Sequence, residues 1–383
     1  MDPRSWHTSY AAGVPTTLTY DRTTVSAAFS RSAKNFPDHP ALNYMGRTIT
    51  YSELESMVRS FARVLSDMGI GPGDKVAVCL PNIPQAIIAN YAVFRIGAVA
   101  VLCNPLYTER ELAYQLNDSD AKIIVTLTLL VPRVEKIRDQ TKIKKIIACH
   151  IHSFLPFPKK QLFPLVKKEM FRKITPTDTV KLFMDLIRGK TDDPVVDKSR
   201  WEDVAALLYT GGTTGVSKGV MLTHANLSCN VQQFVAWFPD LKKGEESLVG
   251  NFPVFHSAGF TAIQNFCLWQ ALDYSCAAAR SLPLTLKFSK NIIPPFFREY
   301  PFIFVGLLAD PAFRKLNFSA SPDFPEPLLA ADTIRELKSL TGANMCEVYG
   351  STENFHRVSA PPERTDQTGY SGMPGARHRC KNR

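Results

Sequence analysis

The sequence predicts an α/β protein, because strand-like and helix-like segments alternate along its first 130 residues and again after residue 200. Short unbroken apolar runs, typical of buried strands, are separated by segments in which apolar residues recur at helical spacing. The chain has 383 residues, of which 45% are hydrophobic, enough for one large core or for two or three lobes. We expect stacked mixed or parallel sheets flanked by helices.

The individual elements follow a regular order. A helix is predicted over 52–68, because Ser52 and Glu55 match a capping box, apolar residues follow at helical spacing and Gly69 supplies a stop. The other predicted elements are a strand at 75–80, a helix at 84–95, a strand at 98–102, a helix at 109–117, a strand at 122–127, a strand at 204–209 and a helix at 330–340. This spacing favours parallel strands joined by right-handed crossovers.

Residues 151–190 interrupt the alternation with a basic segment. Nine Lys or Arg residues stand against three acidic ones, and the run FLPFPKKQLFPLVKK from Phe154 to Lys168 mixes lysines with bulky apolar side chains. Such a mixture suits a lipid interface, where apolar groups insert and cations meet anionic headgroups. It also suits a solvated basic surface with a few packing anchors. The sequence leaves both interpretations open.

Cysteine usage and hydropathy predict a cytoplasmic protein, with peripheral contact at a membrane as an option. The eight cysteines are scattered through apolar segments without a Cys-x-x-Cys pair, which favours buried thiols over disulfides or a zinc site. The sequence starts MDPRSWHT, without an apolar leader, and has no uninterrupted apolar stretch of about 18 residues. We therefore expect neither secretion nor a membrane span.

A Gly- and Thr-rich segment directly after the strand at 204–209 is the strongest chemical signal. Its backbone N–H groups and hydroxyls suit phosphate oxygens, and Lys218 adds a cation. The candidate phosphate-binding residues are Thr210, Gly211, Gly212, Thr213, Thr214, Gly215 and Lys218. We expect this phosphate loop to lead from the strand into a helix that opens at Met221–Leu227. Its spacing is not that of a Walker A motif, and a plain Gly-rich hairpin is the disfavoured alternative.

The loop TGGTTGVSKGV resembles the signature of the adenylate-forming superfamily, which includes acyl-CoA synthetases, luciferases and peptide-synthetase adenylation domains. Gly211 and Ser217 are similar to the long-chain fatty-acid–CoA ligase branch of that family. Further ordered matches are TYSEL from Thr50, GPGDKVAV from Gly71, LPN from Leu80 and NPLYTERELAYQLNDS from Asn104. The resemblance implies the N-terminal lobes of the adenylate-forming fold.

Two later segments extend the resemblance. FPVFHSAGF from Phe252 is similar to the family segment whose histidine lines the acyl and pantetheine tunnel, which implies this role for His256. EVYGSTE from Glu347 is similar to the Tyr-Gly-x-Thr-Glu motif, which implies that Tyr349 and Gly350 bind adenine and Thr352 touches the α-phosphate. The same resemblance assigns Mg²⁺ to Glu353 together with Thr213. Lys218, His256, Thr352 and Glu353 are thus the candidate catalytic residues.

The expected organisation follows from these matches. A first lobe spans 1–200 and includes the basic insertion near 151–190, a second lobe spans 201–353, and 354–383 is a divergent basic tail. The family pattern is lost at 271–300, at 319–329 and after 354, and our hypothesis is that these islands are shifted-frame translations, with genuine divergence as the alternative. The family's mobile C-terminal domain, which carries the adenylation lysine, has no counterpart after Glu353. We therefore expect at most weak or residual activity.

The expected activity is ATP-dependent conversion of a long-chain fatty acid to acyl-AMP and then to acyl-CoA. ATP, Mg²⁺ and CoA as co-substrate are the implied cofactors, and no nucleic-acid partner is expected. Two alternatives stay open. One is an acyl-AMP ligase that serves a carrier protein, and the other is a non-catalytic lipid- or nucleotide-binding protein.

Overall fold

The computed structural model describes most of the chain up to residue 276 and shorter segments beyond it. The described residues are 7, 10, 12–189, 195–210, 217–239, 241–250, 252–276, 296–298, 301–311, 313–315, 323–326, 331–341, 344–349, 352 and 357–358.

A seven-stranded sheet with the order β7-β6-β5-β3-β4-β8-β9 forms one half of the fold. Its strands are β3 (Lys75–Cys79), β4 (Val99–Leu102), β5 (Ile123–Leu127), β6 (Lys145–Cys149), β7 (Val180–Leu182), β8 (Val204–Thr210) and β9 (Lys218–Thr223). All neighbours pair in parallel except β8 and β9, which are antiparallel. The carboxyl ends of the six parallel strands therefore meet at one edge of the sheet.

An eight-stranded sheet with the order β15-β14-β13-β12-β10-β11-β1-β2 forms the other half. Its strands are β1 (Pro40–Tyr44), β2 (Arg47–Thr50), β10 (Ser247–Gly250), β11 (Asp273–Cys276), β12 (Phe296–Arg298), β13 (Asp323–Glu326), β14 (Asn344–Tyr349) and β15 (Arg357–Val358). The hairpin β1–β2 joins strands that come 200 or more residues later, and β1 runs parallel to β11. The lobe boundary at residue 200 stays a prediction. Each sheet contains strands from before and after this residue: β1 and β2 lie in the eight-stranded sheet, and β8 and β9 lie in the seven-stranded sheet.

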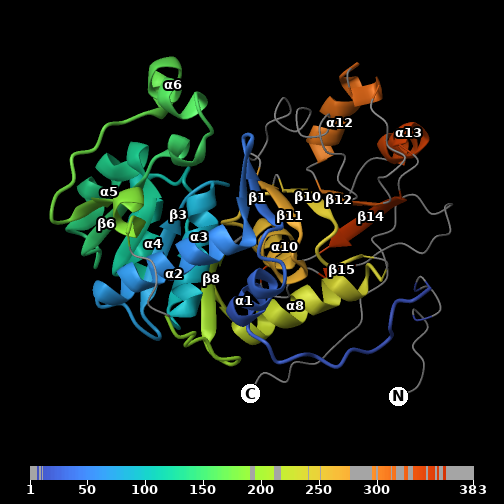
Figure 1. Ribbon diagram of the computed structural model, residues 1–383, viewed down its shortest axis with the longest axis horizontal. Helices are drawn as coiled ribbons and strands as arrows, with labels where there is room; N and C mark the ends of the chain where they lie inside the picture. Colours follow the sequence, from blue (N-terminus) through green and yellow to red (C-terminus); the bar gives the residue numbers. More distant parts are fainter. Residues whose placement is uncertain are drawn as a thin grey trace.

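Helices cover both faces of the seven-stranded sheet (Figure 1). The helices are α1 (Val25–Asn35), α2 (Tyr51–Asp67), α3 (Pro84–Arg95), α4 (Glu109–Asp118), α5 (Val131–Arg138), α6 (Lys159–Val166), α7 (Phe183–Ile187), α8 (His224–Ala236), α9 (Ser257–Gly259), α10 (Phe266–Gln270), α12 (Pro301–Ala309) and α13 (Ala331–Thr341), with a π-helical turn, η5, at Phe260–Asn265. Apolar residues of α4 and α5 pack on one face. A larger core joins α1, α2, α3 and α8 to the other face and to the inner strands of the eight-stranded sheet. Within the described helices, none is long and apolar enough to cross a membrane.

The helix α3 occupies the centre of the larger core. All twelve of its residues are buried, and it packs along α2 and against β3 and β4. A helix without a polar face can be stable only when it is enclosed on every side. Arg95, the last residue of α3, is only 3% exposed. Its guanidinium makes a bidentate ion pair with Glu55 of α2, at 2.6 and 2.9 Å, and donates a hydrogen bond to Ser30 of α1. One guanidinium thus ties three helices together.

Most predicted elements are confirmed, with two corrections. The capping box of α2 is formed by Thr50 and Glu53, not by Ser52 and Glu55, because Thr50 is the last extended residue before the helix and Glu55 faces Arg95. The segments 271–300 and 319–329, where the sequence predicted a loss of the strand pattern, contain β11, β12 and β13 in parallel register with their neighbours. The shifted-frame hypothesis itself stays a prediction. The five cysteines described with their surroundings, Cys79, Cys103, Cys149, Cys229 and Cys267, are buried free thiols.

Loss of the Glu55 carboxylate should be costly, because it leaves the buried guanidinium of Arg95 without its counter-charge. We expect Glu55→Ala to lower the free energy of unfolding by about 3 kcal/mol or more, measured by urea denaturation. Glu202→Ala, which removes the exposed partner of Arg22, is the matched control and should change it by less than about 1 kcal/mol. Equal effects of the two substitutions would contradict the role given to the buried pair.

Two buried groups should give opposing pH dependences. Burial lowers the pKa of His224 to about 4 and raises the pKa of Asp273 to about 6. Between pH 6.5 and 4 the unfolded chain gains a proton at His224 that the folded chain does not, so acidification destabilises the fold, in total by about 3 kcal/mol. Between pH 3.8 and 6 the folded chain keeps a proton on Asp273 that the unfolded chain has released, so the same acidification stabilises it.

Single substitutions should therefore separate the two contributions. Asp273→Asn should make the free energy of unfolding fall more steeply from pH 6.5 to 4, and His224→Gln should make it fall less or rise, as measured by urea denaturation at each pH. Parallel profiles for the wild type and both variants would show that neither group titrates as described.

Candidate functional site

The phosphate loop begins and ends on paired strands. Thr210, the last residue of β8, lies opposite Lys218, the first residue of β9, and Ser217 Oγ donates a 2.8 Å hydrogen bond to the Thr210 carbonyl. Residues 211–216, which include Gly211, Gly212, Thr213, Thr214 and Gly215, lie outside the described part of the chain. Lys218 is exposed, so its cation is accessible at the base of the loop.

This arrangement corrects one prediction. The loop connects two antiparallel strands and does not lead directly into a helix: Lys218–Thr223 is the strand β9, and α8 begins only at His224. Thr223 caps α8 by accepting from the Asn226 N–H, while the Asn226 side chain accepts in return from the Thr223 N–H. The N-terminus of α8 therefore lies a whole strand, β9, away from the loop.

The helix α4 supports the base of this hairpin. Tyr114 Oη donates to the Ser217 carbonyl at 3.0 Å, and Tyr209 Oη donates to Asp118 Oδ2 at 2.6 Å. Gly219 lies beneath the Tyr209 ring, where an added Cβ would come within 3.0 Å of the ring. Burial and the bond to Asp118 hold the pKa of the Tyr209 phenol well above its ordinary value, so the phenol stays a hydrogen-bond donor at neutral pH. These contacts fix the two ends of the phosphate loop.

The segment that contains His256 is held by Asn82, at the carboxyl end of β3. The Asn82 amide is 2% exposed; its Nδ2 donates to the carbonyls of Gly250 and Phe252, and its Oδ1 accepts from the Val254 N–H at 2.9 Å. This side chain joins the two sheets at their carboxyl edges. The Leu80-Pro81-Asn82 motif did not by itself indicate this role for Asn82. The available signal was a polar residue soon after the apolar run at residues 76–80.

His256 itself is exposed at the start of α9. Its Nδ1 accepts from the Ala258 N–H at 3.3 Å, so the proton of the neutral ring lies on Nε2. Gly259 makes this turn possible, because a Cβ there would lie 2.2 Å from the Pro253 carbonyl oxygen. The chain is thus folded tightly on itself, with the imidazole directed outward from the turn.

Thr352 lies beside this segment. Its side chain is 8% exposed, and its hydroxyl donates to Ser257 Oγ at 3.2 Å. Tyr349 ends β14, which runs parallel to β13, β12 and β10, so the chain after β14 and the chain after β10 leave the same edge of the sheet. Gly350 and Glu353 lie outside the described residues.

A buried polar network, which the sequence did not predict, connects η5 to α3. The π-helical turn η5 directs Gln264 and Asn265 toward α3, where Asn90 Nδ2 donates to Gln264 Oε1 at 3.0 Å and Tyr91 Oη donates to Asn265 Oδ1 at 2.9 Å. π-Turns occur often at functional sites, because the wider turn re-aims successive side chains. The network links the segment after β10 rigidly to the central helix.

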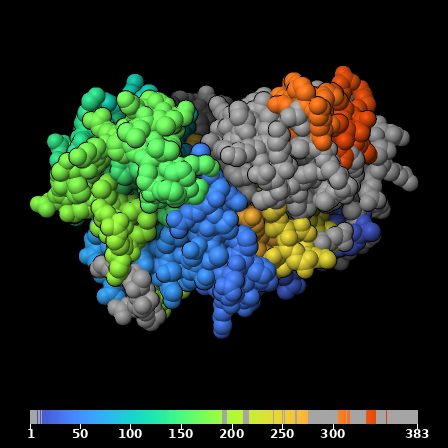
Figure 2. All heavy atoms as spheres, turned by 45° about the horizontal axis from the view of Figure 1, so that its top comes forward, coloured from blue at the N-terminus to red at the C-terminus, as the bar shows by residue number. Residues whose placement is uncertain are grey.

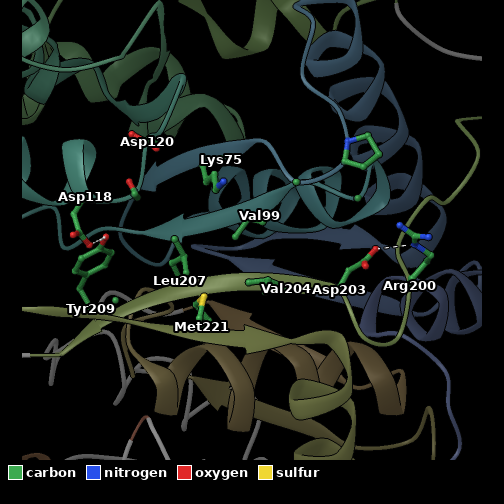
Figure 3. Close-up of a pocket in the computed structure, with 15 residues that line it drawn as sticks. Lys75, Val99, Asp118, Asp120, Arg200, Asp203, Val204, Leu207, Tyr209 and Met221 are labelled. Atoms are coloured by element: carbon green, nitrogen blue, oxygen red, sulfur yellow. Dashed lines mark hydrogen bonds and ion pairs between the residues drawn. The ribbon is translucent and has the colours of Figure 1, made fainter. Parts of the chain in front are cut away.

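A cleft of about 620 Å³ lies on the face of the seven-stranded sheet between α4 and the edge strand β9 (Figure 3). Val99, Leu207 and Met221 form its apolar floor. Its acidic side chains are engaged: Asp118 accepts from Tyr209, Asp203 pairs with Arg200 and Asp120 pairs with Lys142. None of the described candidate residues lines this cleft.

Comparisons with known proteins agree with this geometry. The family model of the AMP-binding enzyme matches residues 29–381. A curated long-chain-fatty-acid–CoA ligase of Bacillus subtilis is 32% identical over 357 residues, and that of Escherichia coli O157:H7 is 34% identical over 392 residues. The alignments cover 91% and 96% of this chain but 63% and 68% of the relatives, so the chain spans about two thirds of their length.

Solved structures show the same fold. The anthranilate CoA ligase AuaEII in complex with anthranoyl-AMP superposes with a TM-score of 0.78 at 21% identity, covering 94% of this chain and 65% of that one. A long-chain-fatty-acid-CoA ligase, FadD1, from Archaeoglobus fulgidus gives the same TM-score at 23% identity, with 96% and 72% covered.

The Asn82 side chain should control the order of the His256 segment. We expect Asn82→Ala to lower the free energy of unfolding by about 2–4 kcal/mol, because it leaves buried backbone groups unpaired. It should also speed amide hydrogen exchange in peptides that contain Val254 to Phe260. Asn117→Ala, which removes one exposed hydrogen bond to the Gln140 carbonyl, is the control and should do neither. Unchanged exchange in Asn82→Ala would mean that the segment is held by other contacts.

Proposed function

We propose that this chain, which belongs to the AMP-binding enzyme family, activates a long-chain fatty acid with ATP and transfers it to the thiol of CoA. The names of the curated relatives supply the substrate class of this proposal. A fatty carboxylate is a poor electrophile at neutral pH, so it must acquire a good leaving group before a thiol can displace it.

In the first step a carboxylate oxygen of the acid attacks the α-phosphorus of ATP. The bond between the α-phosphorus and the bridging oxygen breaks, pyrophosphate leaves and acyl-AMP forms. We assign the phosphate oxygens of ATP to the hairpin loop Thr210–Lys218, whose ends are fixed by the pairing of β8 and β9. Catalysis then consists mainly of positioning and of neutralising charge, which backbone amides, hydroxyls and one ammonium group can supply.

The segment after β14 completes the proposed nucleotide site. Tyr349 and Gly350 would hold the adenine. Thr352 would contact the α-phosphate, its hydroxyl proton turning from Ser257 Oγ to a phosphate oxygen. Carboxylate and hydroxyl oxygens are ligands that suit Mg²⁺. We therefore assign Mg²⁺ to Glu353 and Thr213. When bound, the ion would neutralise charge on the phosphate oxygens of ATP.

In the second step the CoA sulfur attacks the acyl carbonyl carbon. The bond from this carbon to the AMP oxygen breaks, AMP leaves, and the thiol proton passes to solvent. His256 is exposed at the carboxyl edge, and we assign it to the passage through which the acyl chain and the thiol approach each other. The Asn82 hydrogen bonds would keep this histidine in a fixed position relative to the phosphate hairpin.

The observation that carries the proposal is the contact between Thr352 and Ser257. These residues are 95 positions apart in the chain, yet their hydroxyls are hydrogen-bonded, and each belongs to a segment that the sequence had assigned to the same site. In a protein that had lost the nucleotide site, nothing would require the segments that contain Ser257 and Thr352 to stay in contact.

The partners follow from the reaction. We propose that the protein takes a long-chain fatty acid, ATP and CoA, with no nucleic acid, and that it works in the cytoplasm with peripheral contact at a membrane surface.

The adenylation step is tested by ATP–pyrophosphate exchange with palmitate and Mg²⁺. We expect weak exchange that depends on palmitate, and a loss of about 100-fold or more in both Lys218→Ala and Glu353→Ala. Lys218→Ala removes a cation that would stabilise the developing negative charge, and Glu353→Ala removes a proposed ligand of the Mg²⁺ ion that would neutralise it. Lys136→Ala, which removes an exposed lysine paired with Glu109, is the matched control and should keep the wild-type rate.

Two outcomes would contradict the proposal. One is the absence of exchange in a protein whose circular dichroism and cooperative unfolding show that it is folded. The other is exchange that persists in both variants, which would place the chemistry elsewhere. Exchange without any acyl-CoA after CoA is added would restrict the activity to acyl-AMP formation.

A further inference from the structure

The part of the basic segment between β6 and β7 leaves the body of the protein. After β6 the chain forms a short turn at Ile151–Phe154, the helix α6, a second turn at Lys168–Met170, and then returns to β7. None of the residues of α6 is buried. Figure 1 shows α6 standing off the sheet and helix layers, and Figure 2 shows the bright green atoms of this region on the outer surface. We call residues 157–173 the basic protrusion.

Apolar side chains on the basic protrusion face outward to an unusual extent. Ten large apolar or aromatic side chains are exposed among the described residues, and five of them lie between Phe157 and Met170. Their exposed fractions are 83% for Phe157, 48% for Leu162, 66% for Leu165, 69% for Val166 and 40% for Met170. Single exposed apolar residues scattered over a surface are normal. Here, half of the exposed large apolar residues lie within fourteen positions of the chain, and such a concentration marks a contact surface.

The spacing of these residues gives the patch a direction. Leu162, Leu165 and Val166 are three and four positions apart, so they lie on one face of α6. The other bulky side chains hold the protrusion to the body: the Phe163 ring stacks on His152, and the Phe171 ring stacks on His150. Burial and the neighbouring cations lower the pKa of His152 to about 4, so these stacks stay uncharged at neutral pH. The phenylalanines thus anchor the protrusion while the aliphatic face remains outside.

Cations surround the apolar face on both sides. Lys159 and Lys160 precede the aliphatic residues, Lys167 and Lys168 follow them, and Arg172 and Lys173 come next, with Glu169 as the one acid. All six cations are exposed. An apolar strip between two groups of cations is complementary to the boundary of an anionic bilayer, where acyl chains lie just beneath negative headgroups. A nucleic acid would use the cations but has no place for the aliphatic side chains.

We propose that the basic protrusion binds the surface of membranes that contain anionic lipids, with Phe157, Leu162, Leu165 and Val166 inserted among the acyl chains and the lysines at the headgroups. The purpose of this contact depends on the proposed function. A long-chain fatty acid partitions into bilayers, so an enzyme that uses it finds a higher substrate concentration at the membrane surface. The binding itself does not depend on catalysis.

The test is cosedimentation of the full chain with vesicles of phosphatidylcholine alone or of equal parts phosphatidylcholine and phosphatidylglycerol. We expect binding to the mixed vesicles only. The triple variant Phe157→Ser, Leu165→Ser, Val166→Ser keeps every cation and should bind the mixed vesicles at least tenfold more weakly. The variant Lys167→Gln, Lys168→Gln, Arg172→Gln, Lys173→Gln should lose the preference for phosphatidylglycerol.

The matched control is Leu106→Ser with Val196→Ser, which removes two side chains of similar exposure, 82% and 71%, outside the protrusion and should bind as the wild type does. All the substituted residues are exposed, and unchanged thermal unfolding would confirm intact folds. Failure of the wild type to bind mixed vesicles, or wild-type binding by the triple serine variant, would overturn the proposal. The second result would point to a soluble polyanion or a nucleic acid.

Catalysis is measured separately, so that the two proposals fail independently. With palmitate supplied without vesicles, pyrophosphate exchange should be the same in the triple serine variant and the wild type. With palmitate embedded in mixed vesicles, the variant should be slower. No exchange in any protein would count against the proposed function and leave the vesicle-binding result standing.

Discussion

A helix whose twelve residues are all buried has no side to turn toward water, so the polar side chains of α3 can form hydrogen bonds only within the protein. Arg95 finds Glu55 and Ser30, Asn90 finds Gln264, and Gln85 donates to the His150 carbonyl. These partners belong to α1, α2, the turn η5 and the chain after β6. The burial of α3 therefore determines where four other parts of the fold lie.

The same enclosure brings the site together. Because α3 follows β3 directly, the short connection between them carries Asn82 to the edge where β10 ends, and its amide takes hold of the chain that leads to His256. The next helical turn of that chain, η5, is tied back to α3 through Asn90 and Tyr91. The position of His256 relative to β8 is thus set by contacts of the core and not by a surface loop.

The sequence predicted four strands of the seven-stranded sheet, β3, β4, β5 and β8, to within one residue at each end, since unbroken apolar runs leave a strong pattern. It predicted neither β6 nor β7. It predicted the α3 helix at 84–95 with the bounds that the structure has. It missed β9, because the alternation in Lys218–Thr223 is only six residues long and runs into a good helix cap at Thr223. Strands of three or four residues, such as β12 and β13, carry too little pattern to be recognised alone, and they are defined by their neighbours in the sheet.

The site was only partly accessible to sequence reasoning. Motif resemblance named Thr352 and His256 as members of one site, and the structure places Thr352 against the residue next to His256. The resemblance could not reveal that Asn82 holds this segment or that Tyr114 and Asp118 support the hairpin, because these are contacts between residues 90 or more positions apart. Long-range hydrogen bonds of this kind leave no local pattern.

The place at which the basic protrusion leaves the sheet also sets an orientation. The basic protrusion follows the carboxyl end of β6, and the phosphate loop follows the carboxyl end of β8. Because β6 is parallel to β5, β3, β4 and β8, both segments leave the sheet at the same edge. A molecule that rests on a bilayer through α6 turns this edge toward the lipid. A fatty acid held in the bilayer has its carboxylate at the headgroups, so its carboxylate end would approach the protein first. The fatty acid would then reach the protein by diffusion in the plane of the bilayer, in two dimensions instead of three.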